Sequence, residues 1–401
     1  MGGKTAVLRR RAVGMPLWLV PMALFIALLT ATPSEASVAL GKRIKVSAPD
    51  GSVAVVERSP LRLSFRDPAG RTVLEQVAGA GEEPLRVPAV PQNQFGLPAD
   101  PSPASYRPFG FLVGTHAVEQ QTAIPQWFAT LASVTRSGTV YGATRVIGAK
   151  RSRGGVDLRL TTDDPDGREV EAWIRPEGER GLRVSARVTP RRGVAAIADS
   201  FSSAGEEAFH GFGGRHDYLD QRGESFYNWL QQQNVGSGSP DGLATPTDPE
   251  RDRYLFPNGP SAAYYVQSSF VSDRGYGFLL DRDQISHWRM ASDRPDAWQV
   301  EVAGKRLDYL VLPGSAKRAT GAISELNGRH RLPPRWAQGA LLVRSVNFPD
   351  DSPEEYLARV RDDIREIQRT RTPTDAYGIE GWEFLTRSEL RSVIADLVEL
   401  G

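Results

Sequence analysis

The sequence predicts a mainly β protein, in which a large antiparallel β-sandwich precedes a shorter region of alternating strands and helices. Three observations predict this fold class. Short runs with apolar residues at nearly every second position follow one another through the first three quarters of the chain. The 39 glycines and 29 prolines suit a protein with many turns. From residue 332 onward the pattern changes to strand, helix, strand and helix.

Length, charge and cysteine content limit the class of protein. With 401 residues, we expect two domains or one very large β-rich domain. The 49 basic and 48 acidic side chains give a formal net charge of +1, which does not favour nucleic-acid binding. The chain has no cysteine, and this excludes disulfides, cysteine zinc sites, thiol nucleophiles and a lipidated cysteine within it.

The first 36 residues have the pattern of a signal peptide. Basic residues at 4 and 9–11 precede an uncharged apolar stretch at 15–31. Pro16 and Pro21 interrupt this stretch, and a membrane span would need about 20 apolar residues, so we do not expect a stable membrane anchor. Cleavage is expected after Ala36, with Ala39 as the second choice. We therefore expect a secreted, extracellular protein.

The β-sandwich is predicted from short strands that alternate with turn sequences. The first four strands are expected at 43–48, 53–57, 61–66 and 72–77. Seven prolines in the stretch 79–108 exclude regular ladders there. Further strands are expected at 109–115, 126–136, 139–148, 155–161, 168–175 and 182–188, then two within 257–280, a pair within 301–312, and a helix at 315–327.

The last 70 residues have the pattern of parallel α/β units. An uncharged apolar run at 339–343 is typical of a strand buried on both faces. Ser352 and Pro353 then supply the cap and first turn of a helix that extends through residue 368. A second strand is expected at 374–382, and a capping box at 386–389 opens a second helix at 390–400.

Five motifs, taken in order, resemble glycoside hydrolase family 31. They are FHGFGG at 209–214, LDQRG at 219–223, GYGFLL at 275–280, NGR at 327–329 and LPPRWA at 332–337. That family includes α-glucosidases, α-xylosidases and sulfoquinovosidases, and it carries a galactose mutarotase-like β-sandwich before a (β/α)8 TIM barrel. After the signal peptide predicted at 1–36, the resemblance implies the sandwich domain at 37–331 and the beginning of the barrel at 332–401.

The resemblance also implies that the catalytic groups lie elsewhere. The family uses two aspartates on later barrel strands, whereas this chain supplies about two of the eight barrel units. We therefore expect an incomplete barrel, with both aspartates beyond Gly401, and we identify no catalytic residue. The chain alone is expected to be inactive, either as the front portion of a longer enzyme or as a shortened product.

Two candidate substrate-binding residues follow the second predicted barrel strand. Glu380 is expected at the strand's C-terminal end, where enzymes of this architecture build their sites, and Trp382 follows on the loop. The resembling family places an acidic residue at the matching position to hold sugar hydroxyls. The alternatives are an exposed glutamate at a loop tip and a tryptophan that fills the mouth of the barrel.

The segment 220–229 supplies three further candidates for substrate binding. Asp220 and Arg222 carry groups that bind hydroxyls, and Trp229 offers a flat apolar wall. In the resembling family a loop from this region reaches over the barrel mouth. The alternative is a structural loop held by an ion pair between Asp220 and Arg222.

We expect neither a metal nor another cofactor. His210 and His216 are six residues apart, but the sequence shows no third metal ligand. The glycines at 211–214 are not followed by the residues of a phosphate-binding loop.

Three classes of function remain. The first is a secreted α-glucosidase-type glycoside hydrolase that cleaves O-glycosyl bonds of α-glycosides by a retaining mechanism. The second is a non-catalytic carbohydrate-binding or interaction module. The third is a sugar-ring isomerase, although the sequence shows no clear His and Glu pair for that chemistry.

Overall fold

The structure is a computed structural model of the whole chain. It describes residues 42–78, 83–88, 104–124, 129–215, 218–228, 263–329 and 331–332, together with short stretches between 341 and 395. The predicted signal peptide and its cleavage site lie outside the described residues, so they stay predictions. The chain divides into two units, Met1–Ala322 and Ile323–Gly401.

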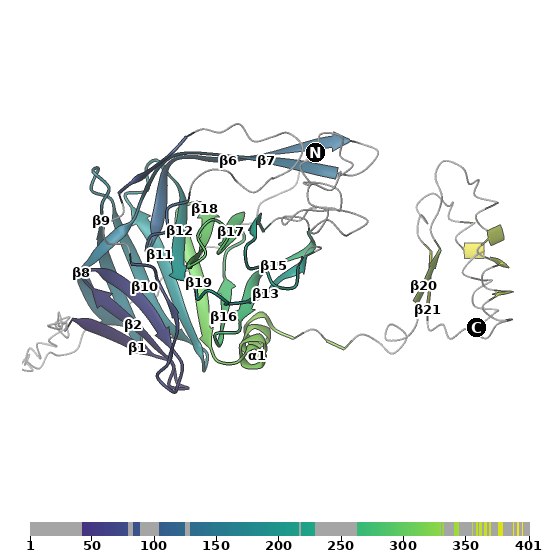
Figure 1. Cartoon of the computed structure of the whole chain (residues 1–401). Helices are drawn as coiled ribbons and strands as arrows, with labels where there is room; N and C mark the ends of the chain where they lie inside the picture. The colour runs from purple at the N-terminus through teal and green to yellow at the C-terminus, as the bar shows by residue number, and fades with distance from the viewer. Residues whose placement is uncertain are drawn as a thin grey trace, which may run out of the picture. The chain divides into compact units, whose positions relative to one another are not determined.

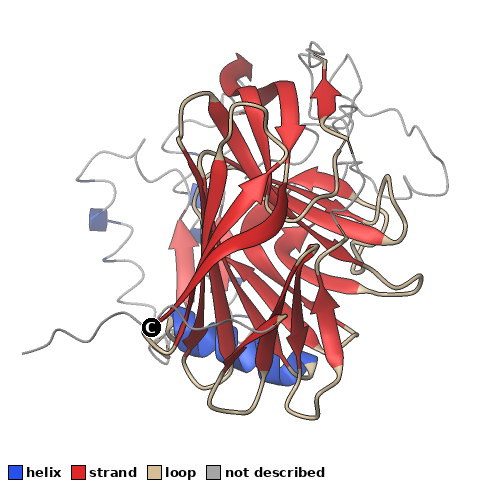
Figure 2. Ribbon diagram, turned by 90° about the vertical axis from the view of Figure 1, so that its left-hand side faces the viewer, coloured by secondary structure: helices blue, strands red, loops and turns tan. Residues whose placement is uncertain are grey.

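The described residues of the first unit form three antiparallel sheets (Figure 1), and strands dominate this unit, as Figure 2 shows. The eight-stranded sheet has the spatial order β13 (Phe209–Arg215), β15 (Ala263–Ser272), β16 (Tyr276–Leu280), β19 (Arg306–Pro313), β11 (Gly181–Thr189), β10 (Glu169–Glu177), β9 (Gly155–Thr162) and β8 (Ala143–Ser152). The seven-stranded sheet has the order β14 (Ser225–Tyr227), β17 (Ser286–Met290), β18 (Ala297–Ala303), β12 (Val194–Ser202), β6 (Gly110–Ile124), β7 (Ala129–Tyr141) and β5 (Leu85–Val87). The small sheet consists of β1 (Arg43–Ser47), β2 (Val53–Arg58), β3 (Leu61–Arg66) and β4 (Thr72–Glu75).

The two larger sheets pack face to face around a shared hydrophobic core. Burial alternates along β10, where Val170 and Ile174 are fully buried while the residues between the buried ones are partly exposed. Across the core, Phe201 of β12 contacts Phe278 of β16 and Tyr309 of β19, with ring centroids 5.8 Å apart in both pairs. The predicted mainly β, antiparallel sandwich is therefore confirmed.

Most predicted elements are found close to their expected positions. The four strands of the small sheet match the first four predicted strands, and α1 (Ala316–Asn327) matches the predicted helix. Among the described residues, no helix is long and apolar enough to cross a membrane.

Two local predictions are wrong. The stretch 79–108 does contain a ladder, because β5 pairs with β7 over three residues, and Pro84 and Pro88 lie just outside these residues and remove none of their N–H donors. The break expected between the strands 126–136 and 139–148 also lies elsewhere, since β7 continues through Gly138 and ends just before Gly142.

The described residues of the second unit agree with the predicted α/β pattern. Strand β20 (Leu341–Arg344) pairs in parallel with β21 (Ala376–Ile379), and the described residues of 355–369 between them are helical. A parallel pair joined through a helix is the unit from which (β/α)8 barrels are built. This pair agrees with the beginning of the barrel that the sequence predicts, and the barrel itself stays a prediction.

A buried carboxylate joins the three sheets of the first unit. Asp199 of β12 is fully buried and accepts hydrogen bonds from Gln76 Nε2 at 2.8 Å, the Tyr309 hydroxyl at 2.8 Å and the Phe109 backbone N–H at 3.2 Å. Gln76 follows the small sheet, while Tyr309 belongs to the eight-stranded sheet. Burial raises the pKa of Asp199 to about 6, although these hydrogen bonds and that of the Ser200 N–H oppose the rise.

Strands β6 and β7 continue beyond their sheet as a two-stranded ribbon. Beyond Gly114 and Gly138 they pair only with each other among the described strands. These two glycines face each other with φ of 154° and 139°, and a Cβ on Gly114 would lie 2.1 Å from the Ser137 carbonyl oxygen. Only glycine allows the two backbones to approach so closely where the ribbon leaves the sheet.

We expect Asp199 to make stability depend on pH. Because its folded pKa of about 6 exceeds the ordinary value of 3.8, the folded state binds this proton more tightly than the unfolded chain does. Below about pH 4 this proton contributes roughly 3 kcal/mol to the free energy of unfolding, and the contribution is lost as the pH rises to about 6. Asp199→Asn has no such titration, so its stability deficit in urea unfolding should shrink by that amount between pH 4 and 7. A constant deficit would contradict this assignment.

Substitution at the glycine pair should destabilise the protein more than ordinary backbone strain does. Gly114→Ala places a Cβ against the opposite backbone, which should cost at least about 2 kcal/mol in the free energy of unfolding. Gly70 is the matched control, since it also has a positive φ of 84°, but a Cβ added there would have nothing within 4 Å. Gly70→Ala should cost about 1 kcal/mol in the same denaturant experiment. Equal losses in the two variants would show that the close approach is unimportant.

Candidate substrate-binding site

The structure describes two of the five residues predicted to bind substrate. Asp220 and Arg222 lie in the segment 218–228, which follows β13 in the sequence and includes β14. Trp229, Glu380 and Trp382 lie outside the described residues, so their roles stay predictions. In the sequence, Trp229 directly follows this segment and Glu380 directly follows β21.

Asp220 fixes the beginning of the segment through backbone groups. Its Oδ1 accepts hydrogen bonds from the Phe209 N–H at 2.9 Å and from the Arg222 N–H at 3.0 Å. An Asp side chain that accepts from the N–H two residues later is a typical turn-forming contact. The carboxylate of Asp220 thus binds the backbone of Arg222. The sequence had suggested, as the structural alternative, an ion pair with the guanidinium of Arg222.

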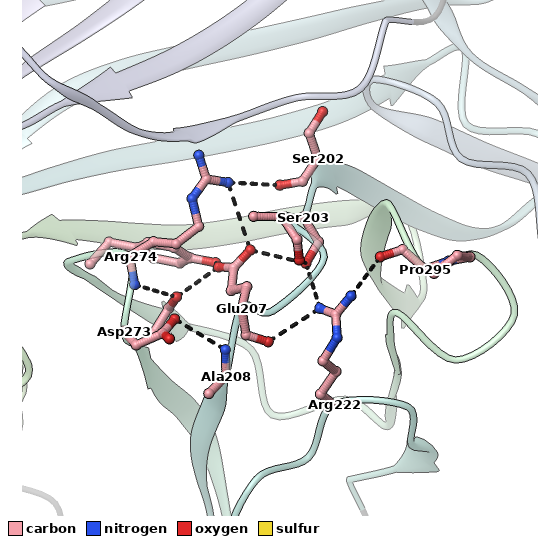
Figure 3. Close-up of polar contacts among 11 residues, drawn as sticks. Ser202, Ser203, Glu207, Ala208, Arg222, Asp273, Arg274 and Pro295 are labelled. Atoms are coloured by element: carbon pink, nitrogen blue, oxygen red, sulfur yellow. Dashed lines mark hydrogen bonds and ion pairs between the residues drawn. The ribbon is translucent and has the colours of Figure 1, made fainter.

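The guanidinium of Arg222 connects the segment to two neighbouring loops (Figure 3). Nη1 donates to Ser203 Oγ at 3.0 Å and to the Glu207 carbonyl oxygen at 3.2 Å, in the loop between β12 and β13. Nη2 donates to the Pro295 carbonyl oxygen at 2.7 Å, in the loop between β17 and β18. The planar fork of an arginine can serve such acceptors at the same time.

A buried glutamate holds one of these loops. The Glu207 side chain is fully buried and accepts hydrogen bonds from Ser203 Oγ at 3.0 Å, Ser272 Oγ at 2.7 Å and the Tyr276 hydroxyl at 2.7 Å. Arg274 Nη1 lies 3.7 Å from the same carboxylate (Figure 3). Burial raises the pKa of Tyr276 well above its usual value, and the charge of Glu207 raises it further. The tyrosine therefore stays a hydrogen-bond donor at any ordinary pH.

The end of the segment packs on a histidine. Ser225 Oγ lies 2.9 Å from His287 Nε2, and the Tyr227 ring stacks on the His287 ring with centroids 4.1 Å apart. Asn228 Oδ1 accepts a hydrogen bond from Arg215 Nη2 at 2.8 Å. Burial, followed by the charges of nearby arginines, lowers the pKa of His287 well below its usual value, so the imidazole is neutral at pH 7.

A buried ion pair lies on the same face of the seven-stranded sheet as His287. Arg136 of β7 donates to both carboxylate oxygens of Glu301 at 2.8 and 2.9 Å. Strands β12 and β6 separate β18 from β7 in the sheet order, so the ribbon must turn over the sheet's outer face to make this contact. At its base, Val134 packs against Tyr227 at the end of the segment.

The charge of this ion pair is retained despite its burial. Burial raises the pKa of Glu301, but the charges of Arg136 and Arg289 and the hydrogen bonds from Arg136 outweigh it and hold the pKa at about 2. Glu301 is therefore ionised at neutral pH. The ribbon and the end of the segment 218–228 are anchored beside each other by charge and packing.

The histidines considered as metal ligands are not gathered by the described part of the structure. His210 Nδ1 lies 3.0 Å from the Leu219 carbonyl oxygen, and His216 lies outside the described residues. No group of three or more His, Asp or Glu side chains that could hold a metal ion occurs among the residues that the structure describes.

Sequence reasoning missed the buried polar residues around the segment. Glu207 follows a short polar run that gives no sign of burial, and its role depends on contacts with residues about 65 positions away. Glu301 and Gln299 alternate with Val300 and Val302 in a pattern typical of a half-exposed strand. Contacts from distant segments cover these outward residues, because Arg136 of the ribbon binds Glu301 and the Ser105 carbonyl oxygen accepts a hydrogen bond from Gln299 at 2.8 Å.

Comparison with known proteins agrees with the motifs. No family model matches the chain. Over 174 residues the chain is 25% identical to the alpha-xylosidase XylQ of Lactiplantibacillus pentosus, an alignment that covers 43% of this chain and 20% of that protein. The match therefore spans about a fifth of the relative's length.

Solved structures of similar proteins include family 31 glycosidases. A sulfoquinovosidase of this family from E. rectale, in complex with an aza-sugar inhibitor, has 15% sequence identity and a TM-score of 0.49, with 74% of this chain and 41% of that chain covered. A Flavobacterium johnsoniae family 31 dextranase has 14% identity and a TM-score of 0.42, with 90% and 36% covered. Because these TM-scores are below 0.5, the description of the sandwich rests on the strand order of this chain alone. The resemblance to glycoside hydrolase family 31 enzymes is confirmed by the alignment with the alpha-xylosidase.

Removing the charge of Glu301 should destabilise the protein strongly. Glu301→Gln leaves Arg136 buried without its counter-charge, which should cost about 3 kcal/mol of unfolding free energy at pH 7. Because the folded pKa of Glu301 is lowered to about 2 from 4.5, its stabilisation is complete above about pH 4.5 and is lost as the pH falls toward 2. The deficit of the variant should therefore shrink below pH 4 in urea unfolding.

The matched control for this experiment is Glu169→Gln. Glu169 pairs with Arg159 at 2.9 Å, but the two side chains are 33% and 64% exposed, so the loss should be below about 1 kcal/mol. Equal losses in the two variants would show that the Glu301 pair is not a buried anchor.

Proposed function

We propose that the chain is the N-terminal part of a secreted glycoside hydrolase that acts on α-linked glycosides. The observation that carries the proposal is the 174-residue match to an alpha-xylosidase, together with the five motifs in the order typical of family 31. The antiparallel sandwich, followed by a parallel strand pair joined through helical residues, supports it. The enzymatic activity, the α-glycoside substrate and the secretion all belong to this proposal.

The proposed chemistry is a retaining double displacement. It requires two carboxyl groups about 5 to 5.5 Å apart on either side of the glycosidic bond, one as nucleophile and one as acid and base. We propose that both come from barrel strands beyond Gly401, so the residues of this chain bind and orient the substrate. The chain alone should then show no turnover.

Glu380 is the residue that we propose to bind sugar hydroxyls. It directly follows β21, and the C-terminal ends of parallel barrel strands form the active face in this architecture. A carboxylate there can accept two hydroxyl hydrogen bonds, while Gly378 and Gly381 on either side leave room for a ligand. Trp382 and Trp229 would supply apolar walls for the sugar rings.

Glu380→Gln should weaken substrate binding without unfolding the protein. The change keeps the shape and removes the charge, so kcat/KM of the enzyme with its complete barrel should fall about tenfold or more on aryl α-glucosides and α-xylosides. Glu366→Gln is the control, because Glu366 forms an exposed pair with Arg369 and should leave kcat/KM unchanged. A normal kcat/KM with a lowered melting temperature would make Glu380 a structural residue.

The same assays test the proposed function as a whole. Hydrolysis with retention of the α configuration supports the proposal. Binding of α-glycosides without hydrolysis by the protein with its complete barrel would favour the carbohydrate-binding module, and neither binding nor hydrolysis would refute both.

A further inference from the structure

Arg222 ties its own segment to two separate loops. Its three acceptors are the Ser203 hydroxyl and the carbonyl oxygens of Glu207 and Pro295, at 2.7 to 3.2 Å. Pro295 is 73 residues away from Arg222 in the sequence, so the contact fixes tertiary structure and does not merely cap a local turn. In Figure 3 the guanidinium points toward these loops.

The loop that receives Arg222 is itself rigidly held. Glu207 is bound by hydroxyls of Ser272 and Tyr276 from the neighbouring strands β15 and β16, each at 2.7 Å. Asp273 Oδ1 accepts from the Ala208 N–H at 3.1 Å on the other side. Arg222 is therefore attached to a fixed part of the sandwich.

The segment 218–228 is also fixed on both sides of Arg222. On one side, the Gln221 N–H donates to the Phe209 carbonyl oxygen at 3.0 Å. On the other, the Gly223 N–H donates to the Met290 carbonyl oxygen at 2.7 Å, and β14 then pairs with β17. The Arg222 side chain supplies the link to the two loops that these backbone bonds do not reach.

We propose that Arg222 is a positioning residue, which sets the course of the segment 218–228 and acts on the substrate only through that segment. This inference rests on the proposed function, because it assumes that the end of the segment forms part of a sugar site. It assigns Arg222 a role different from the direct substrate contact that the sequence suggested. The hydrogen bonds to Ser203, Glu207 and Pro295 carry the distinction.

Arginine chemistry makes the proposal specific. A lysine at 222 would keep the positive charge, but its single ammonium could not serve acceptors in two different loops with the fork geometry. If Arg222 acts by position, Arg222→Lys should fail almost as fully as Arg222→Ala. If it acts by charge on a substrate, Arg222→Lys should retain much of the function.

The first experiment is hydrogen exchange on the 401-residue chain, and it requires no activity. In Arg222→Ala and Arg222→Lys the amides of 221–228 should exchange at least about tenfold faster, while those of β10 and β11 keep their protection. Arg159→Ala is the control, because Arg159 forms an exposed pair with Glu169 elsewhere in the same unit. Unchanged exchange at 221–228 in Arg222→Ala would overturn the inference.

The second experiment separates positioning from contact in the enzyme used for the Glu380 test. Both Arg222 variants should raise KM for aryl α-glycosides about tenfold and change kcat less than about twofold, while Arg159→Ala changes neither. A raised KM in Arg222→Ala that Arg222→Lys restores, with normal exchange at 221–228, would make Arg222 a direct contact. If the native enzyme binds no glycoside, the proposed function fails together with the substrate part of this inference, and the exchange data still decide whether Arg222 holds the segment.

Discussion

The arrangement of the first unit depends on the buried carboxylate of Asp199. An acidic group in the centre of a sandwich is stable only when its oxygens receive enough hydrogen bonds. Here the donors come from different sheets, with Gln76 beside the small sheet and Tyr309 in the eight-stranded sheet. Each donor must reach the same two oxygens, so the relative position of the three sheets is set at this point.

Buried charged side chains also fix the positions of loops and strands elsewhere in the first unit. Glu207 gathers hydroxyls from two neighbouring strands, and Glu301 binds Arg136 of a strand that lies three places away in the sheet. The cations at these two sites, Arg136 and Arg274, are arginines, and the whole chain has only six lysines among its 49 basic residues. A forked cation suits these sites because it bonds several acceptors in fixed directions.

The sequence allowed much of this fold to be predicted, because strands and turns leave local patterns. The four strands of the small sheet, α1 and the parallel pair β20 and β21 follow from apolar spacing, turn tripeptides and a helix cap. The pairing of β5 with β7 could not be predicted in this way. A proline excludes ladder pairing where its missing N–H is needed, and the sequence does not show that the two prolines beside β5 lie outside the three paired residues.

The contacts around the candidate site could not be predicted from the sequence, for a physical reason. Asp220 and Arg222 were singled out from the sequence as candidate substrate-binding residues, but their partners Phe209, Ser203 and Pro295 come together only in the folded chain. Glu301 has the spacing of an exposed residue and becomes buried because the ribbon turns over it. The local spacing of apolar residues does not show whether a distant strand will lie over a residue and bury it.

The two facing glycines at the base of the ribbon have a consequence for how this protein can vary. Beyond Gly114 and Gly138 the ribbon pairs with no other described strand, so residues added or removed there in opposite pairs leave the register of the seven-stranded sheet intact. The same change on the sheet side of the glycines would shift β12 or β5 against its neighbour. Because Arg136 and Val134 anchor the base of the ribbon, small paired insertions beyond these two residues would change the reach of the ribbon without disturbing the sheet or the Glu301 ion pair.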